Sequence, residues 1–260
     1  MADPDKRSSG PAYVLYQRRL RRGLEGAPLP AHVAMILDGN RRWAREAGLD
    51  SVAHGHRAGA DKIREFAGWC DDLGIRMVTL YLLSTDNLSG RTSEELEALC
   101  GIIADLATEL SQVRDWRVQH VGSAHGLPEP LREALTAAEA RGAGKAGLHI
   151  NLAVGYGGRT EIAHAMRSIV AKHAAEGGRL EDLADMLTPA LIADHLWTGG
   201  QPDPDLVIRT SGEQRLSDFM LWQSAHSEFY FVEALGPDLR EVDFLRAMRA
   251  YGQRHRRFGS

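Results

Sequence analysis

The stretch HVAMILDGNRRWA, residues 32–44, decides the fold of this chain. Its first half is an almost unbroken apolar run, which is typical of a strand buried on both faces of a parallel sheet. Asp38 ends the run, Gly39 and Asn40 permit a sharp turn, and a predicted helix begins at Arg41. A carboxylate therefore stands at the carboxyl end of a buried strand, beside a helix N-terminus that favours anions.

This joint has two interpretations. A carboxylate can hold a divalent cation, while Arg41, Arg42 and the backbone N–H groups of a helix N-terminus can hold phosphate. The window then predicts a diphosphate site. The plainer interpretation is a strand–turn–helix joint in which Asp38 only caps the helix. From this window alone the two interpretations have equal support.

The rest of the chain alternates between strand and helix patterns. Further strands are predicted at 77–83, 116–121, 148–154, 205–209 and 228–232. Helices are predicted at 13–24, 57–73, 92–111, 129–141, 158–174 and 241–256, with short helices up to residue 196. Thr92 and Glu95 form a capping box that predicts the start of the helix at 92–111. Strands separated by helices predict a single α/β domain with a mainly parallel central sheet flanked by helices.

Composition limits the class of protein. With 260 residues, 43% apolar and 25% charged, the chain suits a globular domain and not a disordered one. The net charge of −4 argues against a nucleic-acid partner. No apolar run approaches the roughly 20 residues of a membrane span, and we find no signal peptide. Cys70 and Cys100 lack metal-ligand spacing and are expected to be buried thiols, so we expect a cytoplasmic protein.

The N-terminal region predicts a basic amphipathic helix. Apolar side chains recur at helical spacing with arginines between them, at Tyr13, Tyr16, Leu20 and Leu24. Such a helix can make peripheral contact with a membrane surface. Packing on its own domain is the favoured interpretation for so short a helix. We therefore divide the chain into an N-terminal basic segment and helix, residues 1–25, and a main domain, residues 26–260.

A second polar group follows the predicted strand 205–209. The loop RTSGEQRLSDF starts at Arg209, and Gly212 gives it the freedom to fold back. Arg209, Arg215 and Ser217 can then converge on one phosphate group. The loop also follows the carboxyl end of a strand, where ligands bind in open α/β sheets. The alternative is a surface loop with ion pairs among its own residues.

Two further stretches carry weaker signals. The pair His54 and His56 lacks a third ligand at the spacing of a zinc site. The stretch VGYGGRTE, residues 154–161, follows a predicted strand but does not fit a dinucleotide-binding loop. We interpret it as a tight turn beside the active cleft.

With these stretches in view, the chain resembles the cis-prenyltransferases, the family that includes undecaprenyl diphosphate synthase. The motifs that carry the resemblance are HVAMILDGNRRWA at 32–44, GHRAG at 55–59, YLLSTDNL at 81–88, DLVIRTSGEQRLSDFMLWQSAHSEFYF at 205–231 and RRFG at 256–259. Their combination is specific, whereas each alone is weak. The resemblance implies that residues 26–260 form a catalytic domain with a hydrophobic tunnel for the prenyl chain. It also implies that Mg²⁺ assists the condensation of isopentenyl diphosphate with a short allylic diphosphate.

The resemblance further implies roles for matching positions. Asp38 corresponds to the essential aspartate that works with the metal, and Glu228 to a second acid near it. The cradle for the allylic diphosphate corresponds to Gly39, Asn40, Arg41, Arg42, Trp43 and His56. Ser84 and Asn87 correspond to the pair near the proton-transfer path, and Arg209, Arg215 and Ser217 to the isopentenyl diphosphate site. Arg257 and Gly259 correspond to a tail that reaches across a homodimer interface.

Three departures from the family bear on the product. Leu82 stands where long-chain members commonly have a small residue, so the resemblance implies a short product such as (Z,E)-farnesyl diphosphate, as in actinobacterial short-chain enzymes. Two arginines of the allylic site are replaced by Val52 and Gly90, although Arg91 can substitute for the second if the loop shifts. These losses keep an irregular head-to-middle synthase, of the lavandulyl type, as the alternative. A long-chain synthase and a non-catalytic partner subunit are further alternatives.

Overall fold

A parallel sheet of six strands forms the centre of the computed structural model, which describes residues 10–258. The strands are β1 (His32–Ile36), β2 (Met77–Ser84), β3 (Arg117–Val121), β4 (His149–Tyr156), β5 (Leu206–Arg209) and β6 (Glu228–Phe231). Their order is β3-β4-β2-β1-β5-β6, and every neighbouring pair is parallel. The predicted α/β class is confirmed.

The helices lie close to their predicted ranges. They are α2 (Pro11–Leu24), α3 (Asn40–Glu46), α4 (Val52–Asp72), α5 (Thr85–Gly90), α6 (Ser93–Gln112), α7 (Glu129–Gly142), α8 (Gly158–Ala175), α9 (Leu180–Met186), α10 (Pro189–Asp194) and α11 (Glu241–Phe258), with the 3-10 turns η1 (Gln223–His226) and η2 (Gly236–Asp238). The short helix α5 was not predicted. The helix α4 begins five residues before its predicted start, because Ser51 caps it by accepting a hydrogen bond from the amide of Ala53 at 3.2 Å.

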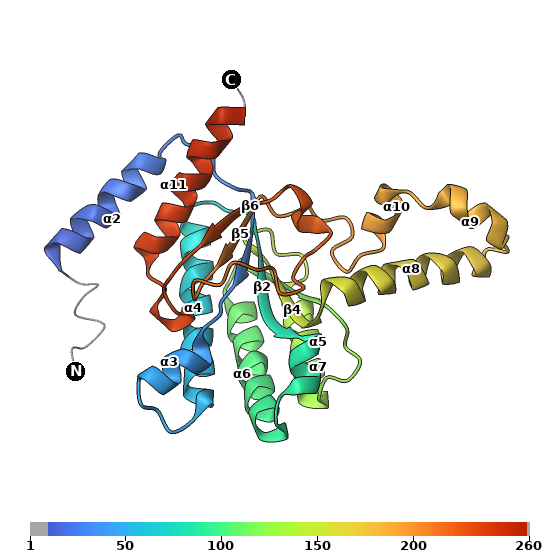
Figure 1. The fold of residues 1–260 in the computed structure, drawn as a ribbon, viewed down its shortest axis with the longest axis horizontal. Coiled ribbons are helices and arrows are strands. Elements are labelled where there is room, and N and C mark those ends of the chain that lie inside the picture. The colour runs from blue at the N-terminus through green and yellow to red at the C-terminus, as the bar shows by residue number, and fades with distance from the viewer. Residues whose placement is uncertain (1–9, 259–260) are drawn as a thin grey trace.

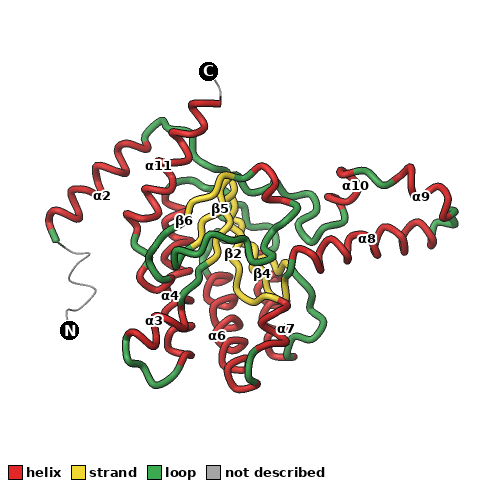
Figure 2. Tube along the Cα trace, viewed as in Figure 1, coloured by secondary structure: helices red, strands yellow, loops and turns green. Residues whose placement is uncertain are grey.

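Alternate residues of the strands enter two different cores. Val33 and Met35 of β1 belong to the larger core, which also takes apolar side chains from α4, α6, α7 and α11. Ala34 and Ile36 face the other way, toward a smaller core that includes Tyr156 and Phe219. Both faces of the sheet are therefore covered, as Figure 2 shows for the strands among the surrounding helices.

The basic helix α2 packs on the domain, as the favoured interpretation predicts. It lies beside α11 (Figure 1), with Leu20 and Leu24 buried. Arg21 pairs with Glu241 and with Asp72, at 2.5 Å and 3.2 Å. Within residues 10–258, no helix is long and apolar enough to cross a membrane.

The connections around β1 position a ligand site. From β1 the chain passes to β2 on one side, and it later reaches β5 on the other side. The strand order thus reverses between β1 and β5, and ligands of open α/β sheets bind in the crevice at the carboxyl ends of such a pair. Asp38 and the loop that begins at Arg209 follow these two ends.

Candidate active site

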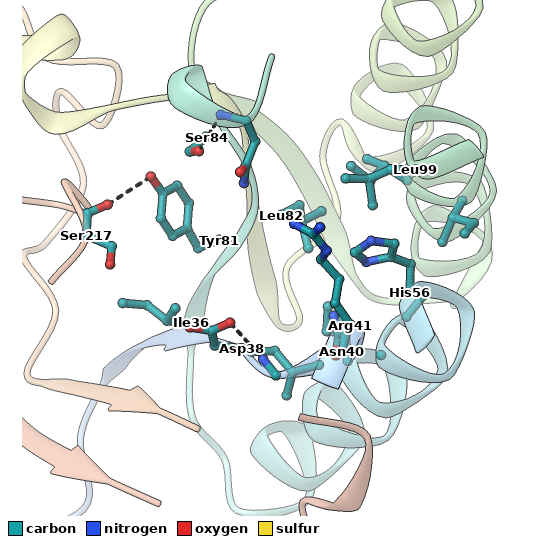
Figure 3. A pocket seen from close by; sticks show the side chains of 18 of the residues that line it. Ile36, Asp38, Asn40, Arg41, His56, Tyr81, Leu82, Ser84, Leu99 and Ser217 are labelled. Carbon is teal, nitrogen blue, oxygen red and sulfur yellow. Dashed lines mark hydrogen bonds between the residues drawn. The ribbon is translucent and has the colours of Figure 1, made fainter. Parts of the chain in front are cut away.

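One cavity of about 750 Å³ opens at this crevice, between the carboxyl ends of the strands and the helices α3, α4 and α6. Its polar lining includes most of the predicted site, namely Asp38, Gly39, Asn40, Arg41, Arg42, His56, Ser84, Asn87, Arg91, Arg209, Arg215 and Ser217. Its apolar lining includes Ile63, Leu82, Leu99, Ile102, Ile103 and Leu106. The cavity therefore joins a charged part to an apolar part (Figure 3).

Asp38 and Arg209 form an ion pair across the crevice. Asp38 Oδ2 accepts a hydrogen bond from the Arg209 guanidinium at 2.7 Å. The same guanidinium donates to Ser217 Oγ at 2.7 Å and to the carbonyl of Arg215. The side chain of Arg209 is 3% exposed and that of Asp38 is 41% exposed. The arginine is thus fixed, whereas the carboxylate still faces the open cavity.

The loop after β5 has a strained backbone. Ser211, Ser217, Asp218 and Met220 all have positive φ angles, of 71°, 49°, 61° and 46°. Such conformations are costly for residues other than glycine and persist where the surroundings hold them. Tyr81 contributes to this support, because its hydroxyl donates to the carbonyl of Ser217 at 3.1 Å (Figure 3).

Arg42 and Arg215, two exposed arginines at the mouth of the cavity, both lie close to the carboxylate of Glu213. Arg215 pairs with Glu213, and Glu213 also lies 3.7 Å from the Arg42 guanidinium. The side chains of Arg215 and Arg42 are more than half exposed, so these pairs hold them only weakly. The predicted alternative of ion pairs within the loop is therefore correct for Arg215 and Glu213, while Arg209 turns to Asp38 instead.

Glycines bring α4 against the start of α3. Added Cβ atoms would lie 2.1 Å from the Asn40 carbonyl oxygen at Gly55, and 2.7 Å from its side-chain amide at Gly59. This close approach explains the two glycines of the GHRAG motif. Gly39 has a φ of 98°, which turns the chain sharply from Asp38 into α3. The first N–H groups of α3 have no intrahelical partner, and they border the cavity.

Glu95 gathers the cationic side chains on the α4 and α6 side of the cavity. It pairs with Arg91, and its Oε1 lies 3.5 Å from both Arg41 Nε and His56 Nε2. Arg91 also donates to His56 Nε2 at 3.3 Å. Burial, together with the charge of Arg91, lowers the pKa of His56, so its imidazole is neutral near pH 7.

Sequence reasoning missed Glu95 as a site residue. We predicted the start of this helix from a capping box formed by Thr92 and Glu95. Thr92 does cap the helix, since its Oγ1 accepts from the Glu95 amide at 3.3 Å. The Glu95 carboxylate instead turns toward Arg41 and Arg91. The sequence signal that could have indicated this contact is Arg91, four residues before Glu95.

Leu82 enters the cavity at an irregularity of β2. Tyr81 pairs with Ala153 and Leu83 with Val154, so Leu82 is an extra residue in the ladder. A bulge of this kind bends a strand and changes the direction of a side chain. Leu82 consequently lines the cavity opposite Leu99 of α6 (Figure 3).

Ser84 and Asn87 lie together at the end of β2. Ser84 is the N-cap of α5, and its Oγ accepts from the Asn87 amide at 3.0 Å. Both residues border the cavity. The Ser84 hydroxyl can still donate its proton, because the cap uses only an acceptor lone pair.

Two predicted residues lie away from the cavity. The Trp43 indole donates to Asp238 Oδ1 at 2.9 Å, and Trp43 does not line the cavity. Glu228 pairs in register with Leu206, level with Val33 at the amino end of the sheet, whereas Asp38 follows the carboxyl end.

Within one chain Glu228 therefore lies at the opposite end of the sheet from Asp38, and the binding of one metal by these two acids stays a prediction. The carboxylate of Glu228 accepts from Arg254 at 2.6 Å.

Val52 and Gly90, which stand where the family has arginines of the allylic site, both lie at helix ends. Val52 begins α4 and Gly90 ends α5. Gly259 and the side chain of Arg257 lie outside the described part of the chain.

The site could hold a divalent metal through one carboxylate together with the phosphates of a substrate. Among the described residues, no group of three His, Cys, Asp or Glu side chains could hold a metal ion by itself. Mg²⁺ commonly binds through one or two carboxylates together with the phosphates of a substrate. Asp38, at the open edge of the cavity, suits this arrangement.

The charged part of the cavity suits a diphosphate, and the apolar part suits a hydrocarbon tail. This geometry defines a class: an α/β enzyme that acts on diphosphate esters with hydrocarbon tails.

Comparisons with known proteins agree with this class. The family model "Putative undecaprenyl diphosphate synthase" matches residues 36–259. A (2Z,6E)-farnesyl diphosphate synthase from Thermobifida fusca is 55% identical over 249 residues, which cover 96% of this chain and 97% of that protein. A short-chain Z-isoprenyl diphosphate synthase from Mycobacterium leprae is 52% identical over 252 residues, which cover 96% of both. The chain belongs to the undecaprenyl diphosphate synthase family of prenyltransferases.

A solved structure shows the same fold. The lavandulyl diphosphate synthase of Lavandula x intermedia, crystallised with dimethylallyl diphosphate, is 38% identical, with a TM-score of 0.79. The match covers 86% of this chain and 95% of that one.

Proposed function

We propose that the protein condenses isopentenyl diphosphate with a short allylic diphosphate, such as geranyl diphosphate, to give a short cis-prenyl product of the (2Z,6E)-farnesyl type. The observation that carries this proposal is the single cavity in which Asp38, two groups of cationic side chains and an apolar wall meet. The names of the relatives from Thermobifida fusca and Mycobacterium leprae support the chain length.

The allylic diphosphate is assigned to the side of α3. The first amides of α3, with Arg41, Arg42, His56 and Arg91, would hold its two phosphates and stabilise the charge that develops on the leaving group. Arg91 would replace the arginine missing at Gly90. The hydrocarbon tail would lie among apolar side chains that exclude water from the cation formed when the carbon–oxygen bond breaks.

The isopentenyl diphosphate is assigned to the loop after β5. Arg209 and Arg215 offer guanidinium groups, and Ser217 offers a hydroxyl, on one side of the crevice. Its double bond would then face the allylic carbon held from α3, so that the new carbon–carbon bond forms between the two anion sites. The departing proton would go to a diphosphate oxygen, and Ser84 and Asn87, which both line the cavity, would help to guide it there.

Asp38 would hold Mg²⁺ together with diphosphate oxygens, and the ion would supply charge stabilisation to the leaving group. To bind the metal, the Asp38 carboxylate would give up the hydrogen bond that it accepts from Arg209. That exchange would leave the buried guanidinium free to bind the acceptor's phosphate. One carboxylate thus links the two diphosphate sites.

Leu82 supports a short product. Because it stands at the bulge of β2 and lines the cavity opposite Leu99, it narrows the apolar part where a growing chain would pass. Alanine at this position would remove three side-chain carbon atoms from the path of the growing prenyl chain.

Incubation with Mg²⁺, isopentenyl diphosphate and geranyl diphosphate tests the proposal. After dephosphorylation, NMR and mass spectrometry should identify a linear C15 alcohol with a new Z double bond. A product branched at the middle of the chain would favour the head-to-middle alternative instead. That alternative is supported by the loss of arginine at Gly90 and by the similarity to lavandulyl diphosphate synthase. A C50 or longer product would establish the long-chain alternative.

We further infer a cytoplasmic homodimer with at most peripheral membrane contact. The edge strand β6 exposes parts of Phe229, Tyr230 and Phe231, and an exposed edge of this kind is a ready pairing surface. The C-terminal end of α11 lies away from α3 (Figure 1), which supports the idea that the tail of the chain serves a partner subunit.

A further inference from the structure

One face of α2 packs on the domain. Leu20 and Leu24 are buried on this face. Gln17 and Arg21, also on this face, both donate to the carboxylate of Glu241 in α11. Among the described elements, α11 is the one with extensive contacts to α2, and α2 lies beside it at the edge of the molecule (Figure 1). The opposite face of α2 is therefore left without a packing partner in this part of the chain.

The outer face of α2 consists of Leu15, Arg18, Arg19 and Arg22. These residues recur at the three- and four-residue spacing of one helix stripe, and all four are exposed. Leu15 is 70% exposed, and the preceding turn of the helix, from residue 11 to residue 14, also presents exposed apolar side chains. The outer face thus joins an apolar end to a basic end.

The arginines of the outer face have no acidic partner among the described residues. The ion pairs of α2 in this part of the chain involve Arg21 alone, which contacts Glu241 and Asp72. Residues 10–25 contain four arginines and one acid, Glu25, although the whole chain has a net charge of −4. The outer face is therefore a basic patch on an acidic protein.

Arg249 of α11 extends this basic patch. The Arg246 guanidinium, which pairs with Asp243 at 3.3 Å, lies over the ring of Tyr16, 5.3 Å from its centroid. The hydrogen bond from Arg246, followed by the charges of the surrounding arginines, lowers the pKa of the Tyr16 hydroxyl. These arginines include Arg19 of α2 and Arg249, which is exposed. A surface with this charge attracts anions.

We propose that the outer face of α2 binds the surface of an anionic membrane. The arginines would contact lipid phosphates, and Leu15 would enter the boundary between the headgroups and the acyl chains. Leu15 favours a lipid surface over a nucleic acid, whose backbone offers phosphates but no acyl layer for a leucine. Because α2 is already folded against its own domain, binding costs little conformational entropy. The inference assigns a surface to peripheral membrane contact, and it does not depend on the proposed reaction.

Sedimentation of the full-length protein with sucrose-loaded vesicles tests the proposal. Vesicles of phosphatidylcholine mixed with phosphatidylglycerol should bind the protein at low salt, and vesicles of phosphatidylcholine alone should not. The triple variant Arg18→Gln, Arg19→Gln, Arg22→Gln should weaken binding about 100-fold, since each basic side chain near an anionic surface contributes about fivefold. Leu15→Ala should weaken it about 10-fold, because three carbon atoms no longer leave water. High salt should release the protein without any substitution.

A second triple variant is the matched control. Arg114→Gln, Arg132→Gln, Arg179→Gln removes the same charge from three exposed arginines elsewhere on the protein. Its binding to anionic vesicles should stay within about threefold of that of the unchanged protein, because these side chains lie outside the outer face. Both triple variants should keep the Tm and the turnover, since glutamine is as good a helix former as arginine and none of these residues lines the cavity.

Four results would overturn the proposal. The first is no binding of the unchanged protein to anionic vesicles, and the second is an equal loss of binding in the two triple variants. Unchanged binding in Leu15→Ala, with duplex DNA bound as tightly as vesicles, would assign the outer face to nucleic acid. A loss of dimer in sedimentation velocity in the first triple variant, without vesicle binding by the unchanged protein, would assign it to a second copy of this chain. Turnover of dissolved substrates is measured separately, so each result leaves the proposed function standing.

Discussion

Replacing Asp38 by alanine should remove turnover and also weaken the fold. The carboxylate is the partner of a guanidinium that is only 3% exposed, so Asp38→Ala leaves the Arg209 charge with fewer acceptors. Ser217 Oγ and the Arg215 carbonyl remain, and the open cavity admits water. Activity should fall far more than stability does, because in the proposed function Asp38 is the side chain that would hold the metal.

The magnitude follows from the exposure of the two partners. Exposed ion pairs contribute about 0.2–1 kcal/mol, whereas removing one partner of a buried pair costs about 3–5 kcal/mol. In this pair the Asp38 side chain is partly exposed and the Arg209 side chain is buried. We therefore expect the free energy of unfolding to fall by about 2 kcal/mol, between these two limits. For a chain of this length that corresponds to a fall in Tm of about 4–8 °C.

Differential scanning fluorimetry and a product assay measure the two effects. Asp38→Asn is the matched control, because its amide oxygen can still accept from Arg209 and should keep most of the Tm. Both variants should lose at least about 100-fold in kcat, since an amide is a poor metal ligand. A normal Tm in Asp38→Ala, or a kcat near that of the unchanged protein in Asp38→Asn, would refute the reasoning.

The remaining predictions concern three other side chains. Leu82→Ala should add longer products to the ladder seen by thin-layer chromatography, and an unchanged ladder would show that Leu82 does not limit the chain. Arg91→Ala should raise the KM for the allylic diphosphate about 10-fold or more while leaving the acceptor KM unchanged, because a charge-assisted hydrogen bond contributes about 1.5–3 kcal/mol. An equal change in both constants would contradict that assignment. Burial lowers the pKa of His149 from its ordinary value of 6.5 to about 4, so the unfolded state takes up a proton in this pH window while the folded state does not. Stability should therefore fall as the pH drops from 6.5 to about 4, by about 1–2 kcal/mol after allowing for partial exposure. Urea titrations should show a smaller loss in His149→Gln, and equal slopes would remove His149 as the cause.

Much of the fold could be predicted because its signals are local. The apolar run before Asp38 and the regular helix patterns after it indicated the parallel sheet. The helix α5 was missed because it has only six residues and begins inside a motif, where Ser84 acts as its cap. The bulge at Leu82 was also missed, since strand pairing depends on the neighbouring strand β4.

The candidate site was predictable only as far as its residues follow strand ends. Asp38 and Arg209 follow neighbouring strands, and the structure brings them together. The position of Glu228 depends on the register of β6 against β5, which a sequence does not specify. Glu95 was interpreted as part of a cap. Arg91 lies only four residues before it, but the other two side chains that it contacts, Arg41 and His56, come from α3 and α4, far away in the sequence.

A crystal structure with Mg²⁺, isopentenyl diphosphate and an unreactive allylic thiolodiphosphate would test the central claim most directly. We predict that Asp38 leaves Arg209 and binds the ion, with one diphosphate on the first turn of α3 and the other on Arg209, Arg215 and Ser217. A complex in which Asp38 still pairs with Arg209, and the acceptor lies away from that loop, would contradict the account.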